Sequence, residues 1–132
     1  MKGYDARDHV KGERLEVRSG MSGQRIVVDR KRQALFKPLQ GDIRARFRSD
    51  KVYLLLGSKQ LEISTPLAVK VGYALAKNGG ACFYLGDFVT LEIGGEEFCL
   101  PPQTAIQLGG VMLKKADRAD DWQRENPRRV VQ

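Results

Sequence analysis

Three arginines at alternate positions are the residues of this chain most suited to chemistry. Residues 42–48 read D-I-R-A-R-F-R, so Arg44, Arg46 and Arg48 alternate with apolar residues. In a strand they share one face, with a spacing of about 6.6–6.8 Å. Tyr53 is predicted to face Arg46 across a hairpin. A ring beside a row of cations is typical of sheet surfaces that bind single-stranded nucleic acid, because cations track the phosphates and the ring stacks on a base.

The arginine strand has three interpretations that the sequence leaves open. Charges on the edge strand of a sheet block edge-to-edge aggregation, so the arginines could be purely protective. They could also contact nucleic acid, either DNA or RNA, or dock on an acidic protein. Arg30, Lys31 and Arg32 lie upstream and add to the basic field. The predicted nucleic-acid-binding residues are Arg44, Arg46, Arg48, Tyr53, Arg30, Lys31 and Arg32.

The positive charge of the chain is concentrated around these residues. The 132-residue chain has a formal net charge of +7, and residues 25–51 contribute nine Lys and Arg against three Asp and Glu. Residues 52–101 have three Lys against five Asp and Glu, so this part is net negative. One basic segment on an otherwise balanced domain favours a polyanion or an acidic partner.

Catalytic and metal-binding chemistry has little support in the sequence. His9 is the only histidine, and phosphate-binding loops, nucleophile motifs and paired metal-ligand spacings are absent. Glu92 and Glu97 are expected to face each other across a hairpin, where a solvated pair is the ordinary interpretation. We therefore expect a non-enzymatic protein without metal or cofactor. No apolar run approaches the roughly 20 residues of a membrane helix, so we expect a cytoplasmic protein that does not associate with membranes.

The two cysteines are expected to be free thiols. Their spacing indicates neither a zinc site nor a disulfide framework. Cys82 is predicted to face inward across from Leu91, and Cys99 to face outward across from Thr90. Opposite faces of a sheet, separated by a strand, exceed the reach of a disulfide.

The elements that must position these residues belong to an internal repeat. Residues 42–77 and 79–114 align without a gap at an offset of 37 residues and share seven identities. A gapless register indicates one supersecondary unit copied in tandem, because insertions or a chance match would drift out of phase. We expect an α+β protein built from two β-β-β-α units, which are antiparallel meanders each closed by a helix, related by pseudo-twofold symmetry.

Turn signals define the strands of each unit. The two-residue turns are Ser49-Asp50 and Gly57-Ser58 in the first copy, and Gly86-Asp87 and Gly94-Gly95 in the second. Pairing around them sets apolar residues opposite one another on one face, as a half-buried antiparallel sheet requires. The predicted pairs are Phe47 with Val52, Ala45 with Leu54, Leu54 with Leu61, Val52 with Ile63, Tyr84 with Val89, Leu91 with Phe98, and Val89 with Leu100.

Each unit is expected to end in a helix. The first helix is predicted over residues 65–78, and the second begins near residue 101 and extends to about residue 126. Gly72 and Gly109 are equivalent positions within these helices, and each costs about 1 kcal/mol relative to Ala. Close backbone approach would explain both glycines, whether the two helices cross there or each helix packs tightly on its sheet.

The two copies differ on their outward faces. Ala81, Phe83 and Leu85 stand in the second copy where the first has its arginines. An outward patch of Phe83 and Leu85 would need a cover. We therefore expect these two residues to serve self-association, as in a homodimer, or to be covered within the chain.

The remainder of the chain is divided by composition. Residues 1–20 are expected to be a leader, from an alternative start or added by cloning, because Met21 resembles a natural start. Within them Leu15 and Val17 alternate with charges, as in a short strand. Residues 21–41 form a basic N-terminal segment, residues 42–126 one domain of two repeats, and residues 127–132 a basic tail.

The tandem of meander and helix resembles the single-stranded nucleic-acid-binding class built on Pur-alpha and Whirly-type repeats. The local likeness is carried by Leu61–Ser64 running into Ala68-Val69, and that class has four strands before its helix where three are expected here. The resemblance implies a sheet surface for single strands. We expect a nucleic-acid-binding accessory module that uses the basic face of the first repeat. The alternative is a small inhibitor or assembly protein, of the kind bacteriophages encode, that docks on an acidic protein.

Overall fold

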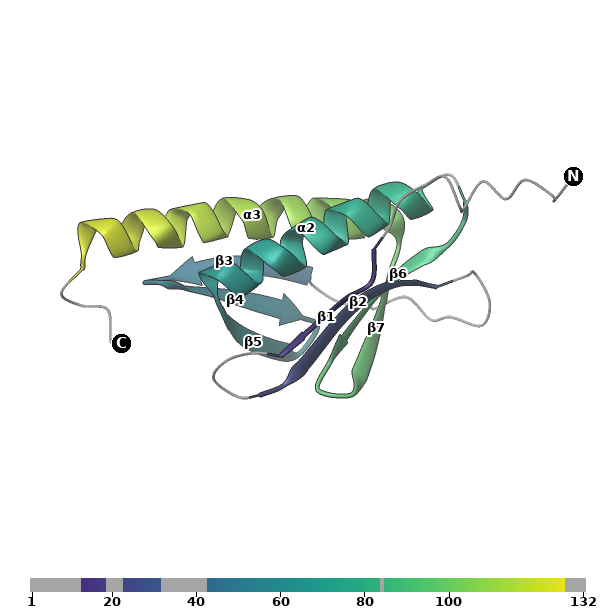
Figure 1. The fold of residues 1–132 in the computed structure, drawn as a ribbon, viewed down its shortest axis with the longest axis horizontal. Coiled ribbons are helices and arrows are strands. Elements are labelled where there is room, and N and C mark those ends of the chain that lie inside the picture. Colours follow the sequence, from purple (N-terminus) through teal and green to yellow (C-terminus); the bar gives the residue numbers. More distant parts are fainter. Residues whose placement is uncertain (1–12, 19–22, 32–42, 84, 128–132) are drawn as a thin grey trace, which may run out of the picture.

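Two antiparallel sheets lie beneath a pair of long helices (Figure 1). The computed structural model describes residues 13–18, 23–31, 43–83 and 85–127. Sheet A has four strands in the order β1-β2-β6-β7, and sheet B has three in the order β3-β4-β5. The elements are β1 Leu15–Arg18, β2 Arg25–Lys31, β3 Ile43–Arg48, β4 Lys51–Leu56, β5 Lys59–Ser64, α2 Thr65–Cys82, β6 Phe88–Ile93, β7 Glu96–Leu100 and α3 Pro102–Glu125. The molecule is therefore α+β, as the sequence predicts.

Sheet B has the strand registers that its turn signals predict. Ser49 has a φ of 56° and Gly57 a φ of 62°, and both values lie in the left-handed region that tight hairpins use. The observed pairs include Phe47 with Val52, Ala45 with Leu54, Leu54 with Leu61, and Val52 with Ile63. These four pairs confirm the prediction. Apart from Phe47, the side chains of these pairs belong to the core or pack against it.

The β6–β7 hairpin of sheet A is also as predicted. Gly94 and Gly95 have φ values of 59° and 89°, which suit a two-residue turn because glycine has no Cβ to clash there. The turn pairs Leu91 with Phe98, and it likewise pairs Val89 with Leu100. The predicted partner of Val89 on its other side, at residue 84, lies outside the described residues.

The described residues of the segment 79–85, which are 79–83 and 85, form no strand, and the prediction of one is wrong. Helix α2 continues through Gly79 to Cys82, and the N–H of Leu85 then donates to the carbonyl of Cys82 at 3.1 Å in a turn. A Cβ on Gly79 would lie 2.7 Å from Cγ1 of Ile106, so α2 packs at this point against the start of α3. This packing outweighs the low helix propensity of glycine, and the helix does not end where the sequence indicated.

Strand β2 takes the place in sheet A that the missing strand was expected to fill. It pairs antiparallel with β6, setting Ile26 opposite Ile93 and Val28 opposite Leu91. Strand β1 pairs with the other edge of β2 and confirms the short strand suggested by Leu15. In the described chain only two strands separate α2 from α3. The duplicated β-β-β-α unit and its pseudo-twofold symmetry are therefore not confirmed.

The two helices meet at the pair of glycines that the repeat singled out. A Cβ on Gly72 would lie 3.0 Å from the carbonyl oxygen of Gly109, and a Cβ on Gly109 would meet the carbonyl oxygen of Gly72. The backbones of α2 and α3 thus touch directly. Of the two explanations for these glycines, close contact between the helices is the one observed.

The core lies between the helices and the inner faces of both sheets. Helix α3 ends at Glu125, close to the predicted position, and packs on β3 and β4 as well as on α2. Its buried residues are Ala105, Leu108, Gly109, Met112, Ala116 and Ala119. Neither α2 nor α3, the helices of the described chain, is apolar over a length that could cross a membrane.

Candidate nucleic-acid interface

Strand β3 presents its three arginines on the face of sheet B that is turned away from the helices. Arg44, Arg46 and Arg48 are exposed, whereas Ala45 between them is buried toward α3. The alternation follows from the pleat of a strand, in which successive side chains point to opposite faces. The structure therefore brings the three predicted arginines together in one exposed row.

Strand β4 places an aromatic ring beside this row. Arg46 pairs directly with Tyr53, while Arg44 pairs with Leu55 and Arg48 with Lys51. Tyr53 is half-buried, so part of its ring remains accessible. The arginine face of sheet B consists of its outward residues Arg44, Arg46, Arg48, Lys51, Tyr53, Leu55, Gln60 and Glu62.

The arginine face carries an excess of positive charge. Lys51 is partly neutralised, because its Nζ lies 3.8 Å from Oδ2 of Asp50. Glu62 pairs with Tyr53 from the far side and is the acidic residue of the face. Within the part of the chain that the structure describes, neither Arg46 nor Arg48 has an ion-pair partner. These two guanidinium groups are thus available to an anionic ligand.

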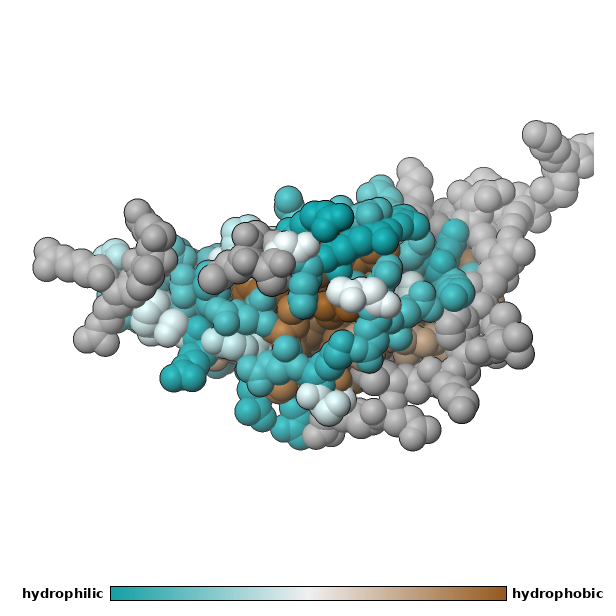
Figure 2. Space-filling view, turned by 90° about the horizontal axis from the view of Figure 1, so that it is seen from below, coloured by the Kyte–Doolittle hydropathy of each residue, from teal (hydrophilic) through white to brown (hydrophobic). Residues whose placement is uncertain are grey.

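The two sheets meet at an apolar hollow on the same side of the molecule. Figure 2 views the side opposite the helices and shows hydrophobic atoms in a hollow ringed by hydrophilic side chains. Between the sheets lies a cavity of about 210 Å³, and an ion pair between Lys59 and Glu96 joins β5 to β7. The cavity is lined by Gln24, Leu54, Leu56, Lys59, Gln60, Leu61, Ile93, Gly94 and Phe98.

The upstream basic cluster does not join the arginine face. Arg30 pairs with Val89 and Lys31 with Phe88, so the two side chains lie on opposite faces of β2 in sheet A. The Nζ of Lys31 lies 3.2 Å from Oε1 of Glu97. In Figure 1 this end of β2 and the arrowhead of β3 lie at opposite sides of the molecule. The third member, Arg32, lies outside the described residues.

Phe83 and Leu85 lie in the turn between α2 and β6, not on a sheet face. The N–H of Phe83 donates to the carbonyl of Gly80 at 3.4 Å, which continues the last turn of the helix. Phe83 is 48% exposed and Leu85 is half-buried. The strand on which they were expected to project is absent, so the two residues do not form the flat outward patch that was predicted.

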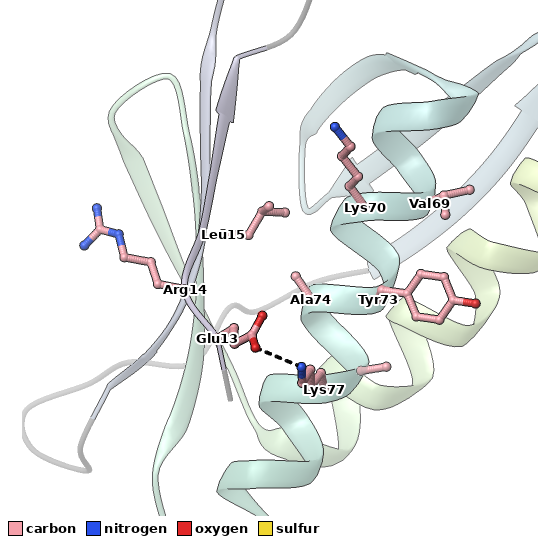
Figure 3. Close-up of a pocket in the computed structure, with 9 residues that line it drawn as sticks. Glu13, Arg14, Leu15, Val69, Lys70, Tyr73, Ala74 and Lys77 are labelled. Carbon is pink, nitrogen blue, oxygen red and sulfur yellow. Dashed lines mark ion pairs between the residues drawn. The ribbon is translucent and has the colours of Figure 1, made fainter. Parts of the chain in front are cut away.

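A groove between β1 and α2 was not found by the sequence reasoning (Figure 3). Its volume is about 720 Å³, within the range of ligand-binding clefts. Leu15 of β1 points toward it, and Val69 and Tyr73 of α2 line the opposite wall. The sequence carries a signal, because these two residues of α2 are four positions apart and lie on one side of the helix. The complete lining is Glu13, Arg14, Leu15, Val69, Lys70, Tyr73, Ala74, Ala76 and Lys77.

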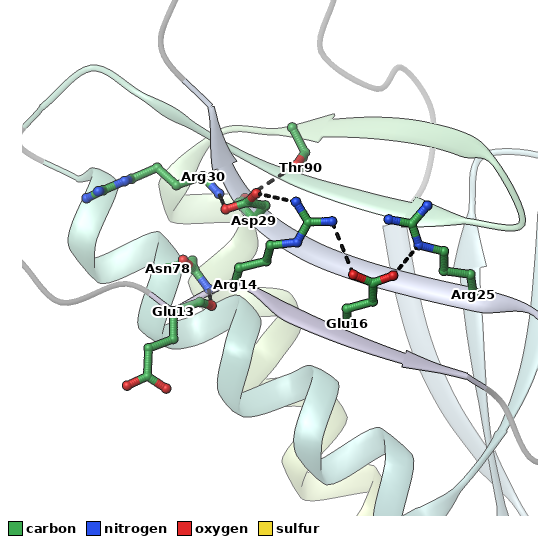
Figure 4. A network of polar contacts seen from close by, with 8 residues as sticks. All are labelled: Glu13, Arg14, Glu16, Arg25, Asp29, Arg30, Asn78 and Thr90. Atoms are coloured by element: carbon green, nitrogen blue, oxygen red, sulfur yellow. Dashed lines mark hydrogen bonds and ion pairs between the residues drawn. The ribbon is translucent and has the colours of Figure 1, made fainter.

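A network of charges covers the outward face of sheet A (Figure 4). Oε1 of Glu16 lies 2.7 Å from Nε of Arg25, and its Oε2 lies 3.3 Å from Nη2 of Arg14. Nη1 of Arg14 also lies 3.5 Å from Oδ2 of Asp29. The hydrogen bond from Arg25 and then its charge hold the pKa of Glu16 below its ordinary value, with a smaller contribution from Arg14. The network stabilises the charged form of Glu16 and has the character of a structural surface feature.

The cysteines are free thiols, as predicted. Cys82 is the last residue of α2 and not a strand residue opposite Leu91, so its predicted position is wrong although its burial is correct. Cys99 faces outward across from Thr90, as predicted, and is nevertheless buried. Burial, and to a lesser extent the charge of Glu97, raises the pKa of the Cys99 thiol. A buried thiol with a raised pKa is a poor nucleophile.

Glu92 and Glu97 face each other across the β6–β7 hairpin, as expected. Lys31 approaches Glu97 from β2 and reduces the repulsion between the two carboxylates. Across the described ranges, no three His, Cys, Asp or Glu side chains gather in a way that could hold a metal ion.

Comparison with known protein families, with curated proteins and with solved structures found no match for this chain.

Proposed function

We propose that the protein is a non-enzymatic accessory module whose arginine face binds single-stranded nucleic acid. The observation that supports this is the exposed row of Arg44, Arg46 and Arg48 next to Tyr53, on a sheet face turned away from α2 and α3. The charges of the row lie at every second residue of one strand, so an extended polyanion that follows the strand passes all three.

The chemistry divides between the two strands. Alternate residues of β3 are about 6.6–6.8 Å apart, which is comparable with the separation of successive phosphates in an extended single strand. Arginine binds phosphate through two parallel N–H donors. Tyr53, on the neighbouring strand, offers a ring on which one base stacks. Glu62, beside Tyr53, is able to accept a hydrogen bond from the exocyclic amino group of that base.

The test is fluorescence anisotropy with labelled single-stranded and duplex DNA and RNA. The variant Arg44→Ala/Arg46→Ala/Arg48→Ala removes the three guanidinium groups from an exposed surface, so the fold is expected to survive. We expect the wild type to bind single strands more tightly than duplexes and the variant to lose that binding. Tyr53→Ala is expected to weaken single-strand binding by about 1–3 kcal/mol, the contribution of one stacked base.

A matched control separates the arginine face from bulk charge. The variant Lys114→Ala/Lys115→Ala/Arg118→Ala removes the same charge from α3, elsewhere on the surface. Binding that falls equally in both triple variants would show a non-specific effect of net charge and contradict the proposed site. Binding that is weak in the wild type and unchanged in the arginine variant would contradict nucleic-acid binding itself.

The second candidate function is docking on an acidic protein, as by a small inhibitor or assembly protein of phage type. It is favoured by the neighbours of the arginines. Tyr53 and Leu55, two residues apart on β4, lie on the same face as the arginines, and protein-binding hot spots are rich in Tyr and Arg. In this case the arginine variant would lose a protein partner in pull-down experiments, while nucleic-acid binding would be weak in every variant.

A further inference from the structure

Strand β1 is a four-residue edge strand whose outward side chains are charged, but it lacks two of the devices that prevent pairing, proline and inward-pointing charges. Within the described strands it pairs with β2 alone, so its other side leaves backbone N–H and C=O groups without a strand partner. Native proteins usually block such edges with proline, bulges or inward-pointing charges. The inward residues of β1 are Leu15 and Val17, and its sequence contains no proline. The edge is therefore competent to accept another strand.

The groove beside β1 adds apolar surface to this edge. Tyr73 is 63% exposed at its wall and is the most exposed large apolar side chain among the described residues. Figure 3 shows the channel between Leu15 on β1 and the flank of α2, closed at one end by an ion pair between Glu13 and Lys77. An open apolar groove of about 720 Å³ that borders an unpaired strand indicates an interaction surface.

The charges along β1 are complementary to themselves. Arg14, Glu16 and Arg18 alternate in sign at every second residue, on the outward side of the strand. In an antiparallel pair related by a two-fold axis, one residue lies on the axis and pairs with its own copy. If that residue is Leu15, Arg14 of each copy pairs with Glu16 of the other, which places opposite charges across from each other twice.

We propose that the β1 edge and the groove beside it bind a second copy of this chain, with β1 pairing antiparallel to its counterpart about Leu15. The pairing joins the two A sheets into one continuous sheet. Both α2 helices then lie on the same side of that sheet, and the trough between them is filled by Leu15 and Tyr73 from each copy. Both copies contribute the same surface to the interface, as in two-fold symmetric dimers, the commonest class of homo-oligomer.

Two other registers are less favourable on the same principles, whereas an axis through Val17 would also set opposite charges, Glu16 and Arg18, across from each other. An axis through Glu16 would set Glu16 across from itself and Arg14 across from Arg18, so like charges would meet. A shift by a single residue would set inward side chains across from outward ones and expose the apolar residues. The alternating charges of β1 therefore disfavour the register whose axis passes through Glu16.

The first test is sedimentation equilibrium across micromolar concentrations. We expect a reversible species of twice the chain mass of 14.8 kDa. Tyr73→Ser removes an exposed ring from the groove without opening the core, and it is expected to weaken the dimer roughly tenfold or more. Phe83→Ser removes a comparably exposed ring outside the groove, and it is expected to leave the dimer unchanged.

A charge-reversal cycle tests the register. Arg14→Glu and Glu16→Arg each set like charges across the axis and are expected to weaken the dimer. The double variant restores opposite charges between copies, so it is expected to recover dimerisation. Within one chain the double variant restores the pair between positions 14 and 16, but it also sets the new glutamate near Asp29 and the new arginine near Arg25. The thermal stability of each variant, measured by circular dichroism, separates an effect on the protomer from an effect on the contact between copies.

The interface lies on sheet A and the arginine face on sheet B, so the proposal is independent of the proposed function. A monomer at all concentrations, with a native circular dichroism spectrum, would overturn it. A dimer that Tyr73→Ser leaves intact and Phe83→Ser abolishes would overturn it too, and would instead support association through the turn at Phe83. A dimer insensitive to both single charge reversals would contradict the register.

Discussion

Gly109 lies where α3 touches α2, and the absence of a side chain there is what allows the contact. A Cβ on Gly109 would meet the carbonyl oxygen of Gly72 and lie 2.9 Å from the backbone nitrogen of Ala76. We predict that Gly109→Ala lowers the free energy of unfolding by about 1–3 kcal/mol, the usual cost of overpacking. This exceeds the gain of about 1 kcal/mol in helix propensity. Urea denaturation followed by circular dichroism measures the change.

The neighbouring Gly110 provides the matched control. A Cβ on Gly110 would have no atom within 4 Å, so Gly110→Ala gains helix propensity without overpacking. We expect it to raise the free energy of unfolding by up to about 1 kcal/mol. If Gly109→Ala stabilised the protein as much as Gly110→Ala, the close contact of the two helices would be wrong.

Glu16 lies between two guanidinium groups that favour its charged form. The hydrogen bond and charge of Arg25 are the main reasons why its pKa is below the ordinary value of 4.5, and Arg14 contributes less. A carboxylate with a lowered pKa stabilises the fold above its unfolded pKa, and the stabilisation is lost as the pH falls through the folded pKa. Any contribution of Glu16 to stability therefore begins to decline below about pH 4.5 and is lost once the pH falls below the lowered pKa of the folded state.

We predict that Arg25→Ala raises the pKa of Glu16 toward 4.5, because it removes the largest cause of the shift. Arg14→Ala is expected to raise this pKa by a smaller amount. Titration of the Glu16 side-chain carboxyl by NMR measures both. A pKa that Arg25→Ala leaves unchanged would show that the ion pair does not persist in solution.

The sequence located some of these residues and not others, for physical reasons. Gly72 and Gly109 stand out because glycine within a helix needs an explanation that propensity does not supply. The partners that Glu16 and Arg14 have on β2 were not predictable, because Arg25 and Asp29 belong to a strand whose place in sheet A depends on contacts distant in sequence. Local rules identify a special residue, but they do not identify its distant neighbours.

At the scale of elements, three of the four predicted hairpins were correct, whereas the hairpin at Gly86-Asp87 and the end of α2 were not. A two-residue turn fixes the register of the strands on either side, so β3–β4, β4–β5 and β6–β7 follow from local chemistry. The neighbour of β6 on its other edge is β2, which pairs Val28 with Leu91. No local signal selects that partner. The repeat suggested a strand over residues 79–85, whereas the packing of Gly79 against Ile106 keeps the start of that segment helical.

Asn78 ties α2 to the start of β1. It is buried, and its Nδ2 donates to the carbonyl oxygens of Glu13 and Ala74, both at 2.8 Å. We predict that Asn78→Ala lowers the free energy of unfolding by about 1–3 kcal/mol, because the partner carbonyls lose their donor. Backbone amides of β1 are expected to exchange faster with deuterium, since the strand loses its anchor to the helix.

Asn126 serves as the control for this prediction. Its Nδ2 donates to the carbonyl of Trp122 at 2.9 Å, the same four-residue step back along the helix, but the structure records no bond from it to another element. Asn126→Ala should leave exchange in β1 unchanged. Equal effects of both variants on β1 would contradict a specific link between Asn78 and Glu13.

At the scale of the whole molecule, two sheets share one helical cover and present separate surfaces. The arginine face belongs to sheet B, whereas the groove and the Glu16 network belong to sheet A. From the sequence, the excess of cations in residues 25–51 read as one basic field. The fold divides it, because β2 enters sheet A and β3 begins sheet B. Charge counts along a chain predict a field only where the topology keeps the residues together.

The salt dependence of single-strand binding tests the central claim most directly. Each neutralised phosphate of a single strand contributes about 0.7 to the slope of log affinity against log salt concentration. If the three arginines each contact a phosphate, the Arg44→Ala/Arg46→Ala/Arg48→Ala variant is expected to lower that slope by about 2 relative to the wild type. The α3 variant Lys114→Ala/Lys115→Ala/Arg118→Ala is expected to keep the wild-type slope. A slope that is the same in the wild type and the arginine variant would contradict the arginine face as a nucleic-acid-binding site.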